Sequence, residues 1–180
     1  MLEMFLKGGP LMYPLLLCSV AGCAIITSKF FQYRSIVRDI EKPLADLQKS
    51  RPAILQPLLA DTAEGYTEKE LAVIGTRQIR EIEKGLSWLA LITTIAPLLG
   101  LTGTVTGMIR AFLVIEKSQS VSPAVLAGGI WVALITTVAG LIIAILVHIG
   151  HHYLEKKADE IAFVIKEIVI AIGTGNSHGD

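Results

Sequence analysis

Three long runs without Asp, Glu, Lys or Arg constrain this 180-residue chain more than any other feature. They cover residues 8–28, 85–109 and 118–154. Each run exceeds the roughly 20 apolar residues that an α-helix needs to cross a bilayer. Charged residues make up only 18% of the sequence, whereas a typical soluble domain has about 25%. The sequence therefore predicts an all-α membrane protein with three transmembrane helices.

The first apolar run is open to two interpretations. Lys7 precedes it and residues 21–24 are small, as in a secretory signal peptide. However, the run is long for a signal core, and no mature extracellular domain is expected after it. We therefore expect a first membrane helix over about residues 11–26.

Lysines and arginines are distributed unequally about the three runs. Of the 16, ten lie between Lys29 and Lys84, three follow the third run, and the other three are Lys7, Lys117 and Arg110. Arg110 lies near the end of a run, where a long side chain can reach the membrane surface. Because basic residues concentrate on the cytoplasmic side, we expect the N-terminus outside and the C-terminus in the cytoplasm.

The apolar periodicity continues past the ends of the second and third runs. A capping box of Thr67 and Glu70 precedes a stripe that leads into the second run. We expect one helix over about residues 68–115, and a third helix that continues through Ile168. At 1.5 Å per residue, both exceed the roughly 30 Å of the hydrocarbon core. The second and third membrane helices should therefore extend into the cytoplasm as long helices.

The predicted organisation has six parts. These are the outside N-terminus and first transmembrane helix (1–28), a cytoplasmic helical segment (29–84), the second transmembrane helix (85–115), a short outside loop (116–123), the third transmembrane helix (124–154), and a cytoplasmic helix with a flexible tail (155–180). The tail, residues 173–180, is small and polar and is expected to be disordered.

Prolines interrupt the cytoplasmic segment. Proline removes a backbone donor and clashes inside a helix, so Pro43, Pro52 and Pro57 should divide this segment into short helices. One apolar face in it is expected to pack against the two long helices and comprises Ile36, Val37, Ile40, Leu44 and Leu47.

A stripe of small residues follows one side of the third run. Gly129, Ala133, Thr137, Gly140 and Ala144 fall within a sector of about 80° at 3.6 residues per turn. Small residues let helices approach closely in lipid, so the stripe is expected to be a packing face. The alternative is a polar lumen lined by Ala133, Thr137 and Thr136, and both roles can coexist in an oligomer.

The second run combines glycines, threonines and a proline. Gly100, Gly103 and Gly107 form a second packing surface. Five threonines accompany them, namely Thr93, Thr94, Thr102, Thr104 and Thr106. A single threonine in a membrane helix usually donates a hydrogen bond to its own backbone and indicates little. A helix that only anchors the chain in the membrane needs no threonine, so the presence of five is more informative. Pro97 frees the carbonyl of Thr93 and predicts a helix kink, which can be structural or functional.

The chain lacks the residues of several other classes of protein. A net charge of zero excludes the basic surface typical of a nucleic-acid-binding protein. Cys18 and Cys23 cannot form a disulfide framework. His148, His151 and His152 have spacings of three and four that could place two imidazoles on one helix face, but no Cys, Asp or Glu precedes them at metal-ligand spacing. We expect no metal, no cofactor and no enzymatic activity. The spans hold no carboxylate, so any proton conduction requires a titrating group from another chain.

Two sequence strings resemble the ExbB/TolQ/MotA proton-channel family. They are APLLGLTGTVTGMI at residues 96–109 and LAGGIWVALITTVAGL at residues 126–141. Three predicted spans with an outside N-terminus are more similar to the ExbB and TolQ branch than to MotA, which has four.

The resemblance implies a homo-pentamer in the bacterial inner membrane around a dimer of a single-span partner of the ExbD, TolR or MotB type. The partner would supply an intramembrane aspartate, and proton flow would drive rotation of one ring relative to the other. A TonB- or TolA-like protein that spans the periplasm is a further implied partner. The family's pore threonine on the third helix matches Thr137.

This sequence departs from the family pattern at two positions. The family's second-helix threonine, two residues before the proline, falls on Ile95. The adjacent Thr94 could take its place after a small rotation of the helix and is expected to line the pore. The family's third-helix glutamate falls on Val132. MotA-type channels function without that glutamate.

The function expected from these observations is that of a proton-channel subunit in an energy-transducing complex. Its alternatives are a non-conducting oligomeric scaffold and a MotA-like stator subunit that drives motility. The sequence leaves open which process is driven and whether protons or sodium ions flow.

Overall fold

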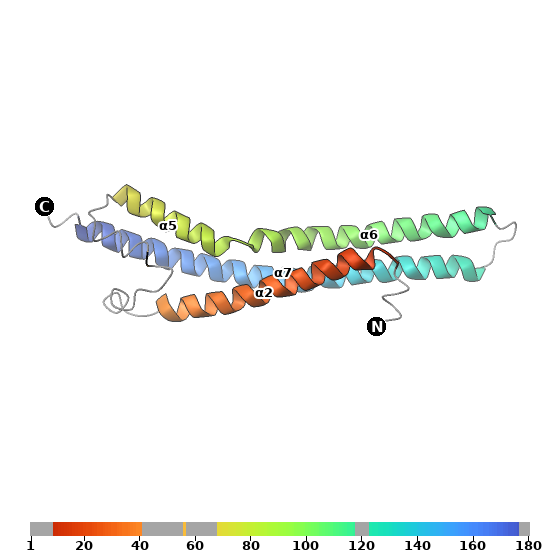
Figure 1. The fold of residues 1–180 in the computed structure, drawn as a ribbon, viewed down its shortest axis with the longest axis horizontal. Helices are drawn as coiled ribbons and strands as arrows, with labels where there is room; N and C mark the ends of the chain where they lie inside the picture. The colour runs from red at the N-terminus through yellow and green to blue at the C-terminus, as the bar shows by residue number, and fades with distance from the viewer. Residues whose placement is uncertain (1–8, 41–55, 57–67, 118–122, 177–180) are drawn as a thin grey trace. The chain divides into compact units, whose positions relative to one another are not determined.

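A computed structural model describes residues 9–40, 56, 68–117 and 123–176. Its helices are α2 (Met12–Ile40), α5 (Glu68–Glu83), α6 (Leu86–Lys117) and α7 (Pro123–Asn176) (Figure 1). These described parts contain no strand. Three helical stretches are long and apolar enough to cross a membrane: Met12–Arg38, Lys69–Lys117 and Ala127–Ala171. The predicted all-α fold with three membrane-spanning helices is thus confirmed.

The chain divides into two compact units. The apolar unit comprises Met1–Ile26 with Trp88–His151, and the charged unit comprises Thr27–Ser87 with His152–Asp180. The apolar unit therefore contains the first part of α2, nearly all of α6 and the first part of α7. The charged unit contains the rest of α2, all of α5 and the rest of α7.

In the apolar unit, α6 and α7 lie side by side and antiparallel (Figure 1). Gly107 of α6 faces Ala133 of α7, whereas Ala96, earlier in α6, faces Gly140, later in α7. The start of α2 packs on this pair through a cluster of Met12, Leu15, Ala96 and Ala144. Large apolar side chains cover much of the outer surface, including Leu101, Leu134 and Leu146. Such a surface suits lipid contact.

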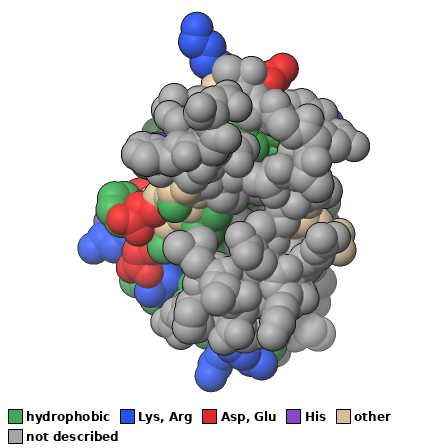
Figure 2. Space-filling view, turned by 90° about the vertical axis from the view of Figure 1, so that its left-hand side faces the viewer, with side chains coloured by type: hydrophobic (Ala, Val, Ile, Leu, Met, Phe, Trp, Pro, Cys, Tyr) green, Lys and Arg blue, Asp and Glu red, His purple; other side chains and the backbone are tan. Residues whose placement is uncertain are grey.

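The charged unit has its own core of α2, α5 and α7 side chains. Tyr33, Leu71, Ile82 and Ile165 are almost fully buried. Viewed from the end that carries α5 and the last part of α7, acidic and basic side chains both lie on the described surface (Figure 2). The unit therefore has a buried apolar core and a surface that carries charges of both signs, although some large apolar side chains such as Val73 and Phe163 are also exposed.

The structure corrects the prediction of one continuous helix from residue 68 to 115. The helix is interrupted at Lys84 and Gly85, between α5 and α6. Gly85 has φ 99°, a left-handed conformation that favours glycine and commonly ends a helix. The apolar stripe continues across this turn, which is why periodicity alone predicts an unbroken helix.

Other predicted boundaries differ by smaller amounts. The first helix begins near the expected residue 11 but continues to Ile40. The third helix continues to Asn176, so the prediction of a disordered tail from residue 173 is wrong for its first four residues. Ile36 and Ile40 are buried in the charged unit. Some predictions fall on residues that the structure does not describe. These residues are Pro43, Leu44, Leu47, Pro52, Pro57, Thr67 and 118–122.

Candidate functional site

The small-residue stripes of α6 and α7 meet each other in a single chain. A Cβ on Gly140 would lie 2.5 Å from the carbonyl oxygen of Ala96, and a Cβ on Gly129 would lie 2.5 Å from the Cβ of Ala111. These distances are too short for a methyl group, so only the hydrogen of a glycine fits at either position. The backbones of α6 and α7 can therefore approach more closely than they could with larger residues. This α6–α7 seam contains the predicted packing residues Gly100, Gly103, Gly107, Gly129, Gly140 and Ala144.

Two of the predicted lumen residues lie inside the seam. Thr136 is 1% exposed and Ala133 is 2% exposed. The hydroxyl of Thr136 donates to the carbonyl of Ala133 at 2.7 Å, and its side chain fills the space beside Gly103. Because both side chains are enclosed by their own chain, their positions favour a packing role over contact with a lumen.

Thr137 lies at one edge of the seam. Its Oγ1 donates a hydrogen bond of 2.9 Å to the carbonyl oxygen of Gly100 and so joins α7 to α6. The side chain is half-buried. Ala139, two residues later, packs on the cluster that contains Met12 and Leu15. Residues two positions apart on a helix lie about 160° apart around its axis. Thr137 therefore lies on the edge of the seam away from α2.

Thr94, like Thr137, lies on a side of its helix away from α2, but it also points away from α7 because Ala96 faces Gly140. It is exposed, and it is separated by about 160° from both Ile92 and Ala96. Ile92 lies near Gly22 of α2, and Ala96 belongs to the cluster with Met12. We call the edge that carries Thr94 and Thr137 the threonine face.

Hydroxyls on α6 mostly bond their own helix. Thr93 and Thr94 both donate to the carbonyl of Ala90, at 2.7 and 3.2 Å. Pro97 lies within α6, which continues beyond it to Lys117. Pro97 has no N–H to donate to the carbonyl of Thr93.

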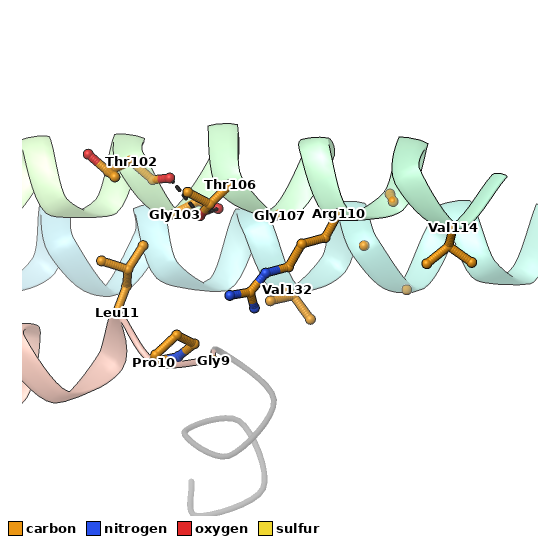
Figure 3. Close-up of a pocket in the computed structure, with 13 residues that line it drawn as sticks. Gly9, Pro10, Leu11, Thr102, Gly103, Thr106, Gly107, Arg110, Val114 and Val132 are labelled. Carbon is orange, nitrogen blue, oxygen red and sulfur yellow. Dashed lines mark hydrogen bonds between the residues drawn. The ribbon is translucent and has the colours of Figure 1, made fainter. Parts of the chain in front are cut away.

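A cavity of about 470 Å³ lies on the other side of the seam, beside the start of α2 (Figure 3). Its lining includes Leu11, Arg110 and Val132. Val132 is the position to which the family resemblance assigns a glutamate. It lies about 140° around α7 from Thr137, so the cavity and the threonine face are separate surfaces.

Sequence reasoning missed two groups of interacting residues. It treated Arg110 only as a residue near a membrane surface, although the structure places its guanidinium at the cavity. It also missed Lys29 and Tyr33, whose Nζ and Oη donate to the carbonyl of Ile82 at 3.0 and 2.7 Å. The spacing of four on α2 puts both on one face, but no local pattern identifies their acceptor on α5.

Within the described ranges, no group of three or more His, Cys, Asp or Glu side chains is arranged to hold a metal ion. His148, His151 and His152 all lie on α7. Cys18 and Cys23 are free thiols.

Residues 43–167 match the MotA/TolQ/ExbB proton channel family. The chain is 35% identical to a biopolymer transport protein named ExbB-like 1 from Synechocystis, over 81% of this chain and 66% of the relative. It is 31% identical to the biopolymer transport protein exbB1 of Vibrio cholerae, over 84% of this chain and 77% of the relative.

A third relative is the biopolymer transport protein ExbB of Neisseria gonorrhoeae, with 32% identity over 67% of this chain and 59% of the relative. The family match includes α5, α6 and most of α7, and therefore the seam and the threonine face. The relatives named ExbB support the ExbB-like branch, which the three predicted spans also favour. This multi-pass membrane protein therefore belongs to the MotA/TolQ/ExbB proton channel family.

Proposed function

We propose that the chain is the channel subunit of an ExbB-like energy-transducing complex in the bacterial inner membrane. Five copies would surround a dimer of a single-span ExbD- or TolR-like partner, which supplies an intramembrane aspartate. The complex would couple the proton motive force to work by a TonB- or TolA-like partner across the periplasm. The unequal distribution of lysine and arginine supports an N-terminus outside and a C-terminus in the cytoplasm.

The observation that carries this proposal is the position of Thr137. Its hydroxyl lies at the edge of an apolar seam that has no Asp, Glu, Lys or Arg from Leu86 to Ile109 or from Pro123 to Val147. A carboxylate in this region therefore has to come from another chain, as the family membership also suggests. The threonine face, which α2 does not cover, is the surface that we assign to the lumen.

The hydroxyl of Thr137 suits contact with a carboxyl group that gains and loses a proton. In the structure it donates to the carbonyl of Gly100, which leaves its oxygen lone pairs free to accept from water or a protonated acid. Rotation about χ1 would instead let it donate to an ionised carboxylate. Thr137 thus serves either protonation state without titrating itself, and the exposed Thr94 adds a second hydroxyl along the same face.

Replacement of Thr137 by valine tests this role. Valine is close in shape but can neither donate nor accept a hydrogen bond, so we expect assembly to persist and proton uptake to fall by about tenfold or more. Uptake should be measured in vesicles that contain the complex reconstituted with its partner. Thr106→Val is the matched control, because its hydroxyl bonds its own helix beside the cavity, away from the threonine face.

Equal proton uptake by Thr137→Val and the unmutated complex would contradict the assignment. Absence of uptake by the unmutated complex in both proton and sodium gradients would favour the non-conducting scaffold.

A further inference from the structure

Among the described residues of the apolar unit, Arg110 has no charged partner. It lies on α6 about two turns before Lys117, and its guanidinium extends toward the start of α2 (Figure 3). A Cβ added to Gly9 would lie 3.9 Å from its Nη1. No carboxylate in the described ranges forms an ion pair with it. A guanidinium stays protonated at any physiological pH, so its charge has to be balanced by an anion or by water.

The cavity beside Arg110 is large enough for a small ligand. Its volume of about 470 Å³ falls within the roughly 300–1,000 Å³ of typical ligand sites. An added Cβ on Gly128, in the lining, would meet no atom within 4 Å. This open space therefore adjoins the guanidinium and is not filled by described side chains.

The lining combines one positive charge with mostly apolar or small groups. Leu11, Val114 and Val132 contribute apolar surface. Thr102 and Thr106 donate their hydroxyl protons to carbonyls of α6, so these protons are not directed at a ligand. The thirteen lining residues include no Asp or Glu. A ligand with an anionic group is stabilised here, whereas an ammonium group finds no counter-charge.

The cavity lies where the helices of the apolar unit begin or end. It is bounded by residues 9–11 just before α2, by the second half of α6 from Thr102 to Val114, and by the second and third turns of α7. The end of a membrane-spanning bundle meets the headgroup layer, where basic side chains contact lipid phosphates. Phospholipid phosphate is therefore the anion most abundant beside Arg110.

We propose that this cavity binds the headgroup of phosphatidylglycerol. The guanidinium of Arg110 would hold the phosphodiester through paired N–H donors, a geometry that arginine provides and lysine does not. The glycerol backbone and the first acyl carbons would contact Leu11, Val114 and Val132. Phosphatidylcholine carries the same phosphodiester, but its ammonium group would lie in a site without an acidic side chain. The proposal requires membrane residence and not ion conduction, so it stands apart from the proposed function.

Lipid retention by the full-length protein, purified in mild detergent with any subunits that assemble with it, tests the site. Native mass spectrometry should compare phosphatidylglycerol with phosphatidylcholine of identical acyl chains. We expect the unmutated protein to prefer phosphatidylglycerol. Arg110→Gln should bind this lipid about tenfold more weakly, as expected for loss of a hydrogen bond to a charged group.

Two further variants separate the site from general effects. Lys117→Gln removes the same charge from the end of α6 outside the cavity lining, and it should keep the preference. Gly128→Leu fills the open space while Arg110 remains, and it should lose the preference. Retention of the preference in both Arg110→Gln and Gly128→Leu would overturn the proposal.

Other occupants of the cavity give distinct results. Displacement of phosphatidylglycerol by inorganic phosphate alone would identify a site for a soluble anion and contradict a lipid site. Glu3 lies outside the described residues and is the acidic residue closest in sequence to Gly9. If the unmutated protein shows no lipid preference and Glu3→Gln acquires one, the chain's own N-terminal segment occupies the cavity, and the proposal is wrong.

Discussion

At Gly140 two helix backbones approach more closely than a side chain permits. A Cβ there would lie 2.5 Å from the carbonyl oxygen of Ala96 and 3.2 Å from the Cα of Gly100. Both are backbone atoms, so no rotamer change relieves the contact, and the helices themselves have to separate. We expect Gly140→Ala to lower the free energy of unfolding by about 1–3 kcal/mol, the usual cost of overpacking. Thermal unfolding in detergent measures this loss.

Gly128→Ala is the matched control for Gly140→Ala, because the added methyl group meets no atom within 4 Å. Alanine favours helix over glycine by about 0.5–1 kcal/mol, so this variant should be as stable as the unmutated protein or more stable. Equal loss of stability in the two variants would show that close approach at the seam does not limit stability. Because the seam lies within one chain, loosening of the seam should precede any dissociation of the proposed pentamer.

At the scale of the element, the turn between α5 and α6 is stabilised from α2. The last carbonyls of a helix have no helical partner, and Ile82 lies in the last turn of α5. Its carbonyl oxygen instead accepts hydrogen bonds from Tyr33 and Lys29. Tyr33 is 2% exposed. We expect Tyr33→Phe to destabilise α5 by about 1–2 kcal/mol, because a buried acceptor loses one donor.

Amide hydrogen exchange measures the effect of Tyr33→Phe on α5. Protection should fall in α5 while the α6–α7 seam remains protected. Tyr153→Phe, in the same unit, is the control because Tyr153 is 49% exposed. Its ring stays beside Phe30 in the variant, and protection should be unchanged. Unaltered exchange in Tyr33→Phe would mean that Lys29 alone caps the turn.

At the scale of the whole molecule, thirteen basic residues belong to the predicted cytoplasmic segments and three to the other side, which accounts for all 16. This bias predicts which segments face inward. In a background without Cys18 and Cys23, a membrane-impermeant thiol reagent applied to spheroplasts should label Lys117→Cys. The reagent should label Arg77→Cys only after the membrane is opened. The reverse pattern would overturn the proposed orientation.

The sequence by itself determined the features that depend on local composition. Runs without charge predicted three membrane helices, because burial of charge in hydrocarbon is costly regardless of how the helices pack. The periodicity predicted that the second and third helices extend past these runs. The family strings predicted the membership that the comparisons confirm. The stripes of small residues identified the surfaces of α6 and α7 that approach closely, but not the partner of each.

The tertiary structure decided how these surfaces face one another. Both glycine stripes pack together in one chain, which places Thr136 inside the seam and Thr137 at its edge. The same packing puts Val132 and Arg110 at a common cavity. Helical spacing fixes only the angle between side chains on one helix. The rotation and register of each helix against its neighbours depend on which side chains fit together across the whole interface.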